Sequence, residues 1–123
     1  MPRRRRILIS LCVAMALLGG WMAWLRYDDA RSRIFDAETW RETRGTDYVR
    51  GRMVPDLLAR HRLEGMTRTQ LASLLGEPTQ LRDGAFVYDL GYPDDDPFPI
   101  DPYQLVIDFD ARGIAVRHAV VQG

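Results

Sequence analysis

The sequence predicts an α+β domain, in which two short helices pack on one face of an antiparallel sheet of three to four strands, preceded by one N-terminal transmembrane helix. Three observations predict this two-layer sandwich. Residues 7–25 carry no charge, residues 53–75 place leucines at helical spacing, and residues 79–120 alternate apolar and polar side chains. We therefore expect a cytoplasmic basic tail at 1–6, a membrane anchor at 7–25, a charged linker at 26–52 and the folded domain at 53–123.

The composition excludes several classes of protein. The chain has 123 residues, with 17 Arg and no Lys, 17 acidic residues and one Cys. A single Cys cannot build a disulfide scaffold or a thiolate zinc cluster. Residues 26–123 hold 13 Arg against 17 acids, a net charge of −4, whereas nucleic-acid-binding domains are normally basic, so we expect no nucleic-acid partner. A hydrophobic content of 46% excludes a wholly disordered chain.

The N-terminal segment is typical of a membrane anchor. As a helix, residues 7–25 would span about 28 Å, close to the roughly 30 Å thickness of the hydrocarbon core. The four Arg at positions 3–6 favour a cytoplasmic N-terminus, and Trp21 and Trp24 suit the headgroup layer at the far end. We expect a single-pass inner-membrane protein with a periplasmic domain. A cleaved signal sequence, with a weak site at Ala14-Met15-Ala16, and a lipoprotein modified at Cys12 are the alternatives.

The segment 26–52 is dense in charge and sparse in apolar residues. We expect a solvated stalk with one short helical turn near 36–44. In the alternative interpretation, Phe35 and Trp40 dock on the domain or on a partner.

Two short helices are predicted at the start of the domain. The first places its apolar stripe at i, i+3, i+4 and i+7, with a proline in its first turn (Val54, Leu57, Leu58, His61; Pro55). The second begins at Thr67, with Gln70 three residues on as in a capping box and Met66 placed for a hydrophobic staple. Its buried stripe is leucine, and Gly and Pro end it (Leu71, Leu74, Leu75; Gly76, Pro78).

The sheet is predicted from period-two alternation and turn residues. Asp83-Gly84 indicates a two-residue hairpin that pairs Leu81 with Phe86. Residues 91–102 contain four Pro and four Asp, which predicts a loop. Two more strands follow, at 103–110 and 114–120. With residues 111 and 112 as their loop, Ile107 would face Val116.

Part of the domain resembles a known family. The stretch Gly65-Met66-Thr67-Arg68-Thr69-Gln70-Leu71, followed by Leu74-Leu75-Gly76-Glu77-Pro78, is similar to the signature of the SmpA/OmlA (BamE-like) domain of bacterial envelopes. The resemblance covers about residues 53–121. It implies a two-helix module with three or more strands that acts by binding other proteins. The best-known member is an outer-membrane lipoprotein of the β-barrel assembly complex, whereas Cys12 here lacks a lipoprotein context, so membership of that complex is not implied.

The sequence contains no recognisable motif for catalysis or for binding a cofactor. Ser32 and Ser73 lie in no nucleophile motif, and His61 and His118 fall on apolar stripes where a partly buried, hydrogen-bonded state is expected. We therefore expect no enzyme, no cofactor and no metal site. The loop carboxylates, with Asp89 nearby, are oxygen ligands suited to calcium (Asp94, Asp95, Asp96, Asp101). They lack the order of an EF-hand, so a solvated turn is the preferred interpretation.

Charge asymmetry indicates where a partner would bind. Residues 26–68 hold ten Arg and eight acids, whereas residues 69–123 hold three Arg and nine acids. Acidic surface of this kind steers association, although it also simply keeps small domains soluble. We expect a protein-binding accessory or scaffold of the envelope, with an unidentified protein partner, and contacts from Asp94, Asp95, Asp96, Phe35 and Trp40. The alternative is a small-ligand or lipid sensor whose site is lined by Phe35, Trp40, Tyr48 and the sheet edge.

Overall fold

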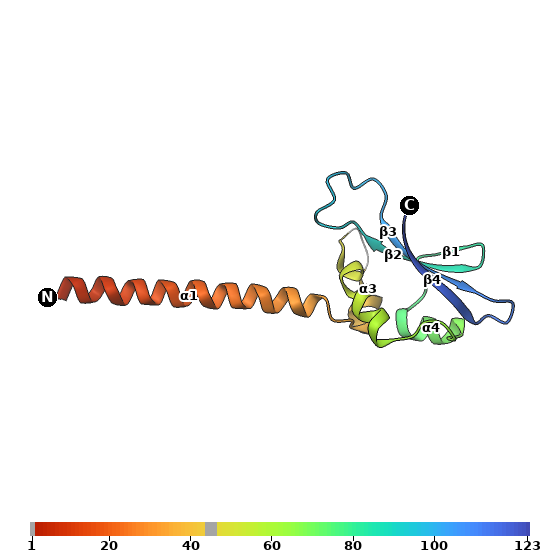
Figure 1. Cartoon of the computed structure of the whole chain (residues 1–123), viewed down its shortest axis with the longest axis horizontal. Coiled ribbons are helices and arrows are strands. Elements are labelled where there is room, and N and C mark those ends of the chain that lie inside the picture. Colours follow the sequence, from red (N-terminus) through yellow and green to blue (C-terminus); the bar gives the residue numbers. More distant parts are fainter. Residues whose placement is uncertain (1, 44–46) are drawn as a thin grey trace. The chain divides into compact units, whose positions relative to one another are not determined.

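The structure is a computed structural model that describes residues 2–43 and 47–123. The chain divides into two compact units, an N-terminal helix and a domain that runs from Arg33 to Gly123. Helix α1 spans Pro2–Ser32 (Figure 1). It is long and apolar enough to cross a membrane once, and its apolar segment is not buried by the rest of the chain.

The domain contains a four-stranded antiparallel sheet in the order β1-β2-β3-β4. Each strand pairs with its neighbours in sequence, so the sheet is a simple meander. The strands are β1 (Gln80–Arg82), β2 (Ala85–Gly91), β3 (Tyr103–Phe109) and β4 (Ala115–Gln122). The predicted α+β class is confirmed.

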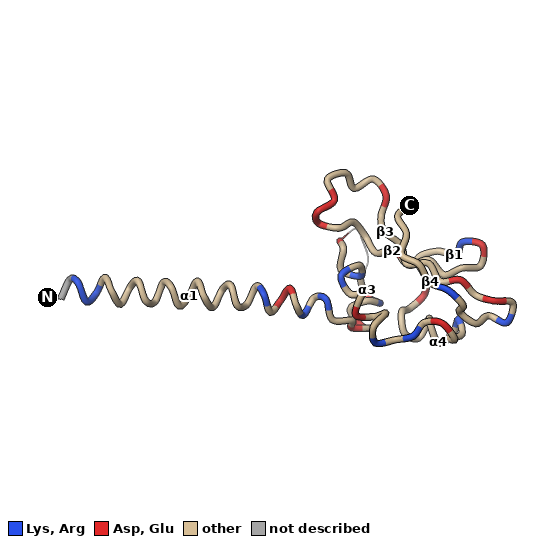
Figure 2. The backbone as a smooth tube through the Cα atoms, in the orientation of Figure 1, with Lys and Arg blue, Asp and Glu red and all other residues tan. Residues whose placement is uncertain are grey.

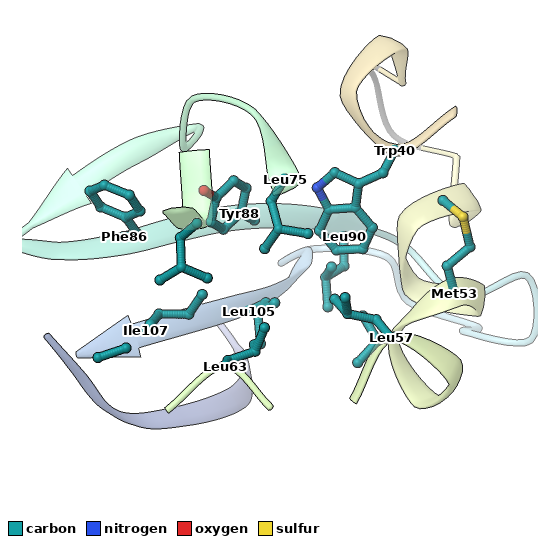
Figure 3. Packing of buried hydrophobic residues seen from close by; sticks show 13 residues of the cluster. Trp40, Met53, Leu57, Leu63, Leu75, Phe86, Tyr88, Leu90, Leu105 and Ile107 are labelled. Atoms are coloured by element: carbon teal, nitrogen blue, oxygen red, sulfur yellow. The ribbon is translucent and has the colours of Figure 1, made fainter. Parts of the chain in front are cut away.

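Three short helices precede the sheet: α2 (Ala37–Glu42), α3 (Val49–Arg60) and α4 (Arg68–Leu75). Helix α3 packs against β2, and α2 contacts α4. The core lies between the helices and one face of the sheet, where leucines of α3 and α4 meet aromatic and aliphatic residues of β2 and β3 (Figure 3).

The folded unit starts earlier than the sequence predicts. The sequence predicts a linker over residues 26–52, but Trp40 of α2 is fully buried within the core cluster. The backbone N–H of Phe35 also donates to Asp56 of α3 at 2.7 Å. The domain therefore begins at Arg33 rather than at 53, and of the two interpretations of this segment, docking on the domain is the one that the structure supports.

Helix α3 also begins before its expected start. Its first residue is Val49, so Pro55 lies inside the helix instead of in its first turn. The earlier turn is possible because Gly51 has no side chain: a Cβ there would lie 2.0 Å from Cε2 of the Tyr48 ring. That ring stacks edge-on with Tyr103 of β3, and the contact holds the start of α3 against the sheet.

Helix α4 forms as the sequence predicts. Thr67 accepts from Gln70 N at 3.1 Å, and Gln70 Oε1 accepts from Thr67 N at 2.9 Å, which completes the capping box. Leu71 and Leu75 are fully buried, whereas Leu74 is only partly so. Gly76 ends the helix with φ of 76°.

The first hairpin has the predicted register. Leu81 pairs with Phe86 and Arg82 with Ala85 around a two-residue loop. Asp83 and Gly84 both have positive φ, at 51° and 83°, as a type I′ turn requires.

The last hairpin differs from prediction by two residues. Ile107 pairs with His118, not with Val116, because a bulge lies opposite Asp108 and Phe109. The bulge accounts for one residue of this shift, and a loop one residue longer than predicted accounts for the other, since Phe109 pairs with Ala115 and not with Ile114. In this loop the Asp110 carboxylate accepts from the backbone N–H groups of Arg112 and Ile114. A shift of two residues in the register keeps each side chain of a strand on the same face, so His118 stays on the helix-covered side of the sheet. Val116 has no partner in the register and is 53% exposed.

Candidate functional site

The residues expected to contact a partner divide into two groups in the structure. Phe35 and Trp40 pack edge-on against each other, with ring centroids 5.9 Å apart, and Trp40 reaches into the core beside Tyr88 (Figure 3). With Trp40 fully buried and Phe35 partly buried, neither presents an exposed aromatic surface. In this structure both rings join α2 to the domain, and their expected contact with a partner stays a prediction.

The second group lies in the loop between β2 and β3, residues 92–102, which we call the acidic loop. It projects beyond the sheet in Figure 1, and Figure 2 marks its acidic positions in red along the backbone. Asp94 forms an ion pair with Arg52 of α3 and remains 75% exposed. Asp95 is exposed, and Asp96 accepts from Phe98 N at 3.0 Å.

Two apolar residues of the acidic loop were missed by the sequence analysis. Phe98 and Ile100 are 76% and 78% exposed, more than any other large hydrophobic residue of the described chain. Period-two and helical patterns cannot find such residues because the loop has neither. Their only sequence signal is an apolar residue after each of Pro97 and Pro99 in an otherwise acidic stretch.

The carboxylates of the acidic loop do not converge. Within residues 2–43 and 47–123, no group of three or more His, Cys, Asp or Glu side chains is placed to hold a metal ion. The Asp94 carboxylate binds Arg52, whereas the Asp96 carboxylate binds the backbone of the loop, so the two carboxylates have different partners.

A separate cleft of about 500 Å³ lies where α2, the end of α4 and β2 meet. Its wall is of mixed charge, with an apolar part from Leu75, Pro78 and Leu90. Sequence reasoning missed it, because its polar residues come from four separate segments. They are two arginines, three acids and two threonines (Arg41, Arg50; Asp47, Glu77, Asp89; Thr43, Thr79).

Several groups of the cleft already serve the fold. Arg50 Nε donates to the Trp40 carbonyl at 2.8 Å, and its guanidinium lies 5.3 Å from the centroid of the indole. Thr79 Oγ1 accepts from Asp89 N at 2.9 Å. Beside the cleft, Tyr88 Oη donates to the Gly76 carbonyl at 2.9 Å, and burial raises the pKa of this phenol far above its usual range. Tyr88 is therefore a neutral structural donor near neutral pH.

The two histidines are packed into the fold. His61 lies edge-on to Phe35, with ring centroids 5.5 Å apart. His118 Nδ1 contacts Glu64 Oε1, and both side chains are 31% exposed. Burial works against the charge on Glu64, but its hydrogen bonds, including that to His118, leave the pKa of this carboxyl below its usual value.

Comparison of the chain with protein-family models, with curated proteins and with solved structures finds no match.

Proposed function

We propose that this protein is a membrane-tethered, non-catalytic protein of the bacterial envelope, and that its BamE-like domain binds another protein as an accessory or scaffold. One observation carries the proposal: the two units of the chain differ in kind. Helix α1 leaves its apolar side chains uncovered, whereas the domain buries a core of its own. An uncovered apolar helix is stable in a bilayer, and the domain then remains in water.

The ends of the helix support an orientation. Arginines precede the apolar run, as on the cytoplasmic side of inner-membrane proteins. Trp21 and Trp24 lie near its other end with ring centroids 6.1 Å apart, where indoles favour the headgroup layer. We therefore assign the N-terminus to the cytoplasm and the domain to the periplasm, with the helix uncleaved.

The acidic loop supports protein binding. It carries four Asp and no Arg, and it is held by its ion pair to Arg52 on α3. A negative surface of this kind raises the rate of encounter with a basic partner and repels acidic ones. The resemblance of the helix motif to the BamE-like family favours the same mode of action.

The tether is tested by extraction of membranes with alkaline carbonate. The natural chain should stay in the membrane pellet, and the double variant Leu17→Arg/Leu18→Arg should lose most of it, since each arginine at the helix centre costs about 2.5–3.5 kcal/mol on insertion. Ala30→Arg, outside the apolar run, is the matched control and should stay in the pellet. A natural chain found free in the cytosol, or one that starts after Trp24, contradicts the tether.

Protein binding is tested by crosslinking in intact cells followed by mass spectrometry. Replacement of Asp94, Asp95 and Asp96 by Asn should strongly reduce the adducts formed by the natural chain. Asp83→Asn changes an exposed acid of the β1–β2 turn and should leave them intact. Adducts that are unaffected by the triple change would show that the acidic loop is not the contact.

The cleft favours a second candidate, a small-ligand sensor. Its volume of about 500 Å³ is in the range of ligand pockets, although its lining differs from the residues that the sequence suggested. A ligand at a hundred times its Kd stabilises a protein by about 2.7 kcal/mol. A rise in the melting temperature of the solubilised chain on addition of envelope lipids, abolished by Glu77→Arg at an exposed position of the cleft wall, would support this candidate.

A further inference from the structure

Phe98 and Ile100 are the most exposed large apolar side chains in the described part of the chain. They exceed even the large apolar residues of α1, of which Met15 is the most exposed at 72%. Removal of apolar surface from water favours the formation of a complex. An adjacent pair of this size is the kind of anchor that fills a pocket at the centre of an interface.

The loop backbone around the pair is constrained. Ile100 N donates to the Phe98 carbonyl at 2.8 Å, which closes a tight turn on Pro99. Asp96 accepts from Phe98 N at 3.0 Å, and Tyr92 Oη donates to the Ile100 carbonyl at 3.4 Å. Pro97 and Pro99 fix their own φ angles as well. Less conformational freedom is therefore lost when the pair binds.

The charges beside the pair select the class of partner. Asp94, Asp95 and Asp96 precede it, Asp101 follows it, and no arginine lies between residues 83 and 111. Anionic lipid headgroups would be repelled by these carboxylates, so a membrane surface is disfavoured. A protein pocket rimmed by Arg or Lys would be attracted to the same carboxylates while its apolar floor receives the two side chains.

We propose that Phe98 and Ile100 are the apolar anchor of the acidic loop, and that they insert into an apolar pocket with a basic rim on a partner protein. This inference rests on the proposed protein-binding function and gives that function a specific contact. Ion pairs at the rim steer the approach, and the buried pair slows dissociation.

The test places the photocrosslinker benzoylphenylalanine at position 98 of the full-length chain in cells, and separately at positions 81 and 120. Leu81 and Val120 are exposed at 65% and 43% on the strands at the two edges of the sheet, so they are matched controls. We expect position 98 to yield a discrete protein adduct whose crosslinked peptide, mapped by mass spectrometry, holds apolar residues beside Lys or Arg.

A quantitative test follows with a crosslinker at position 95, which leaves the pair intact. There, Phe98→Ser/Ile100→Ser should reduce the yield of the same adduct at least about tenfold, the effect of an anchor worth about 1.4 kcal/mol. Leu81→Ser should leave the yield unchanged. Because the two anchor side chains are exposed, the melting temperature of the double variant should match that of the natural chain, which separates lost binding from unfolding.

Each of the following outcomes would contradict the proposal that Phe98 and Ile100 anchor a partner protein. A lipid adduct at position 98 indicates a membrane contact, and an adduct with a second copy of this chain indicates self-association. Protein adducts from positions 81 or 120 alone would remove the anchor but keep the protein-binding function. If no position gives a protein adduct, both proposals fail.

Discussion

The indole of Trp40 packs edge-on against the ring of Tyr88, with the two centroids 6.2 Å apart and the ring planes at 60°. This contact joins α2 to β2, an interior strand of the sheet. The contact also explains why α2, in a charged segment for which the sequence predicts a solvated stalk, belongs to the folded domain: its tryptophan is fully buried in the core.

Trp40→Ala should therefore destabilise the domain by about 3–5 kcal/mol, the usual cost of removing a large buried aromatic side chain. Denaturant unfolding of the full-length chain, followed by near-ultraviolet circular dichroism, measures the loss. Ile34→Ala is the control in the same segment, because Ile34 is 47% exposed. A loss below about 1 kcal/mol for Trp40→Ala would show that α2 is not part of the cooperative unit.

Trp40→Phe should cost less than Trp40→Ala. Nε1 of Trp40 is buried, and no described residue accepts its hydrogen bond. Phenylalanine removes that unsatisfied donor, which offsets part of the free energy lost with the indole volume.

The two adjacent leucines of α4 should respond differently to truncation. Leu75 is fully buried, and Leu74 only packs against the edge of the core. Leu75→Ala should cost about 2–5 kcal/mol, and Leu74→Ala clearly less. Equal losses in the same unfolding assay would mean that the helix is rotated relative to the sheet.

Much of the fold could be predicted because local chemistry fixes it. The capping box of Thr67 and Gln70 needs only residues three apart, and the hairpin at Asp83-Gly84 needs only two residues that tolerate positive φ. The register of β3 and β4 could not be predicted in the same way. It depends on the Asp110 side chain, which binds the N–H of Ile114 and lengthens the loop.

The candidate site was harder to predict than the fold. The sequence leaves the burial of Phe35 and Trp40 open, because sparse apolar residues among charges show no amphipathic period. Phe98 and Ile100 are exposed in the structure, but the sequence could not predict this, because an apolar residue in a loop gives no sign of whether other residues cover it. Whether these side chains are buried or exposed depends on how segments distant in the sequence pack together.

Gly76→Ala should destabilise the domain by about 1–3 kcal/mol. The φ angle of 76° disfavours a side chain, and a Cβ would lie 3.0 Å from Cγ of Arg41 on α2. Gly65→Ala is the matched control, because its φ is 94° but no atom lies within 4 Å of the added Cβ. The loss at position 76 should exceed that at position 65, and Arg41→Ala should recover the difference. Equal losses would assign the whole effect to backbone strain.

Acid should destabilise the last hairpin through Asp110. The hydrogen bond from Ile114 N is the main cause that lowers the pKa of this carboxyl; burial opposes it, and Arg112 adds to the lowering. A carboxyl with a lowered pKa in the folded state stabilises that state above its ordinary pKa of 3.8 and loses this contribution as the pH falls through and below it. The pKa of Asp36, lowered mainly by Thr39, and that of Glu64 act in the same direction.

Asp110→Asn isolates the contribution of this carboxylate. Asparagine still offers Oδ1 to the N–H groups of Ile114 and Arg112 but carries no charge. We expect a lower melting temperature at neutral pH and a shallower decline in acid than in the natural chain. Asp95→Asn removes one exposed charge outside this turn and should keep the natural pH profile. Parallel profiles for Asp110→Asn and the natural chain would show that the Asp110 charge does not stabilise the loop, because a carboxylate that binds both N–H groups must lose that advantage on protonation.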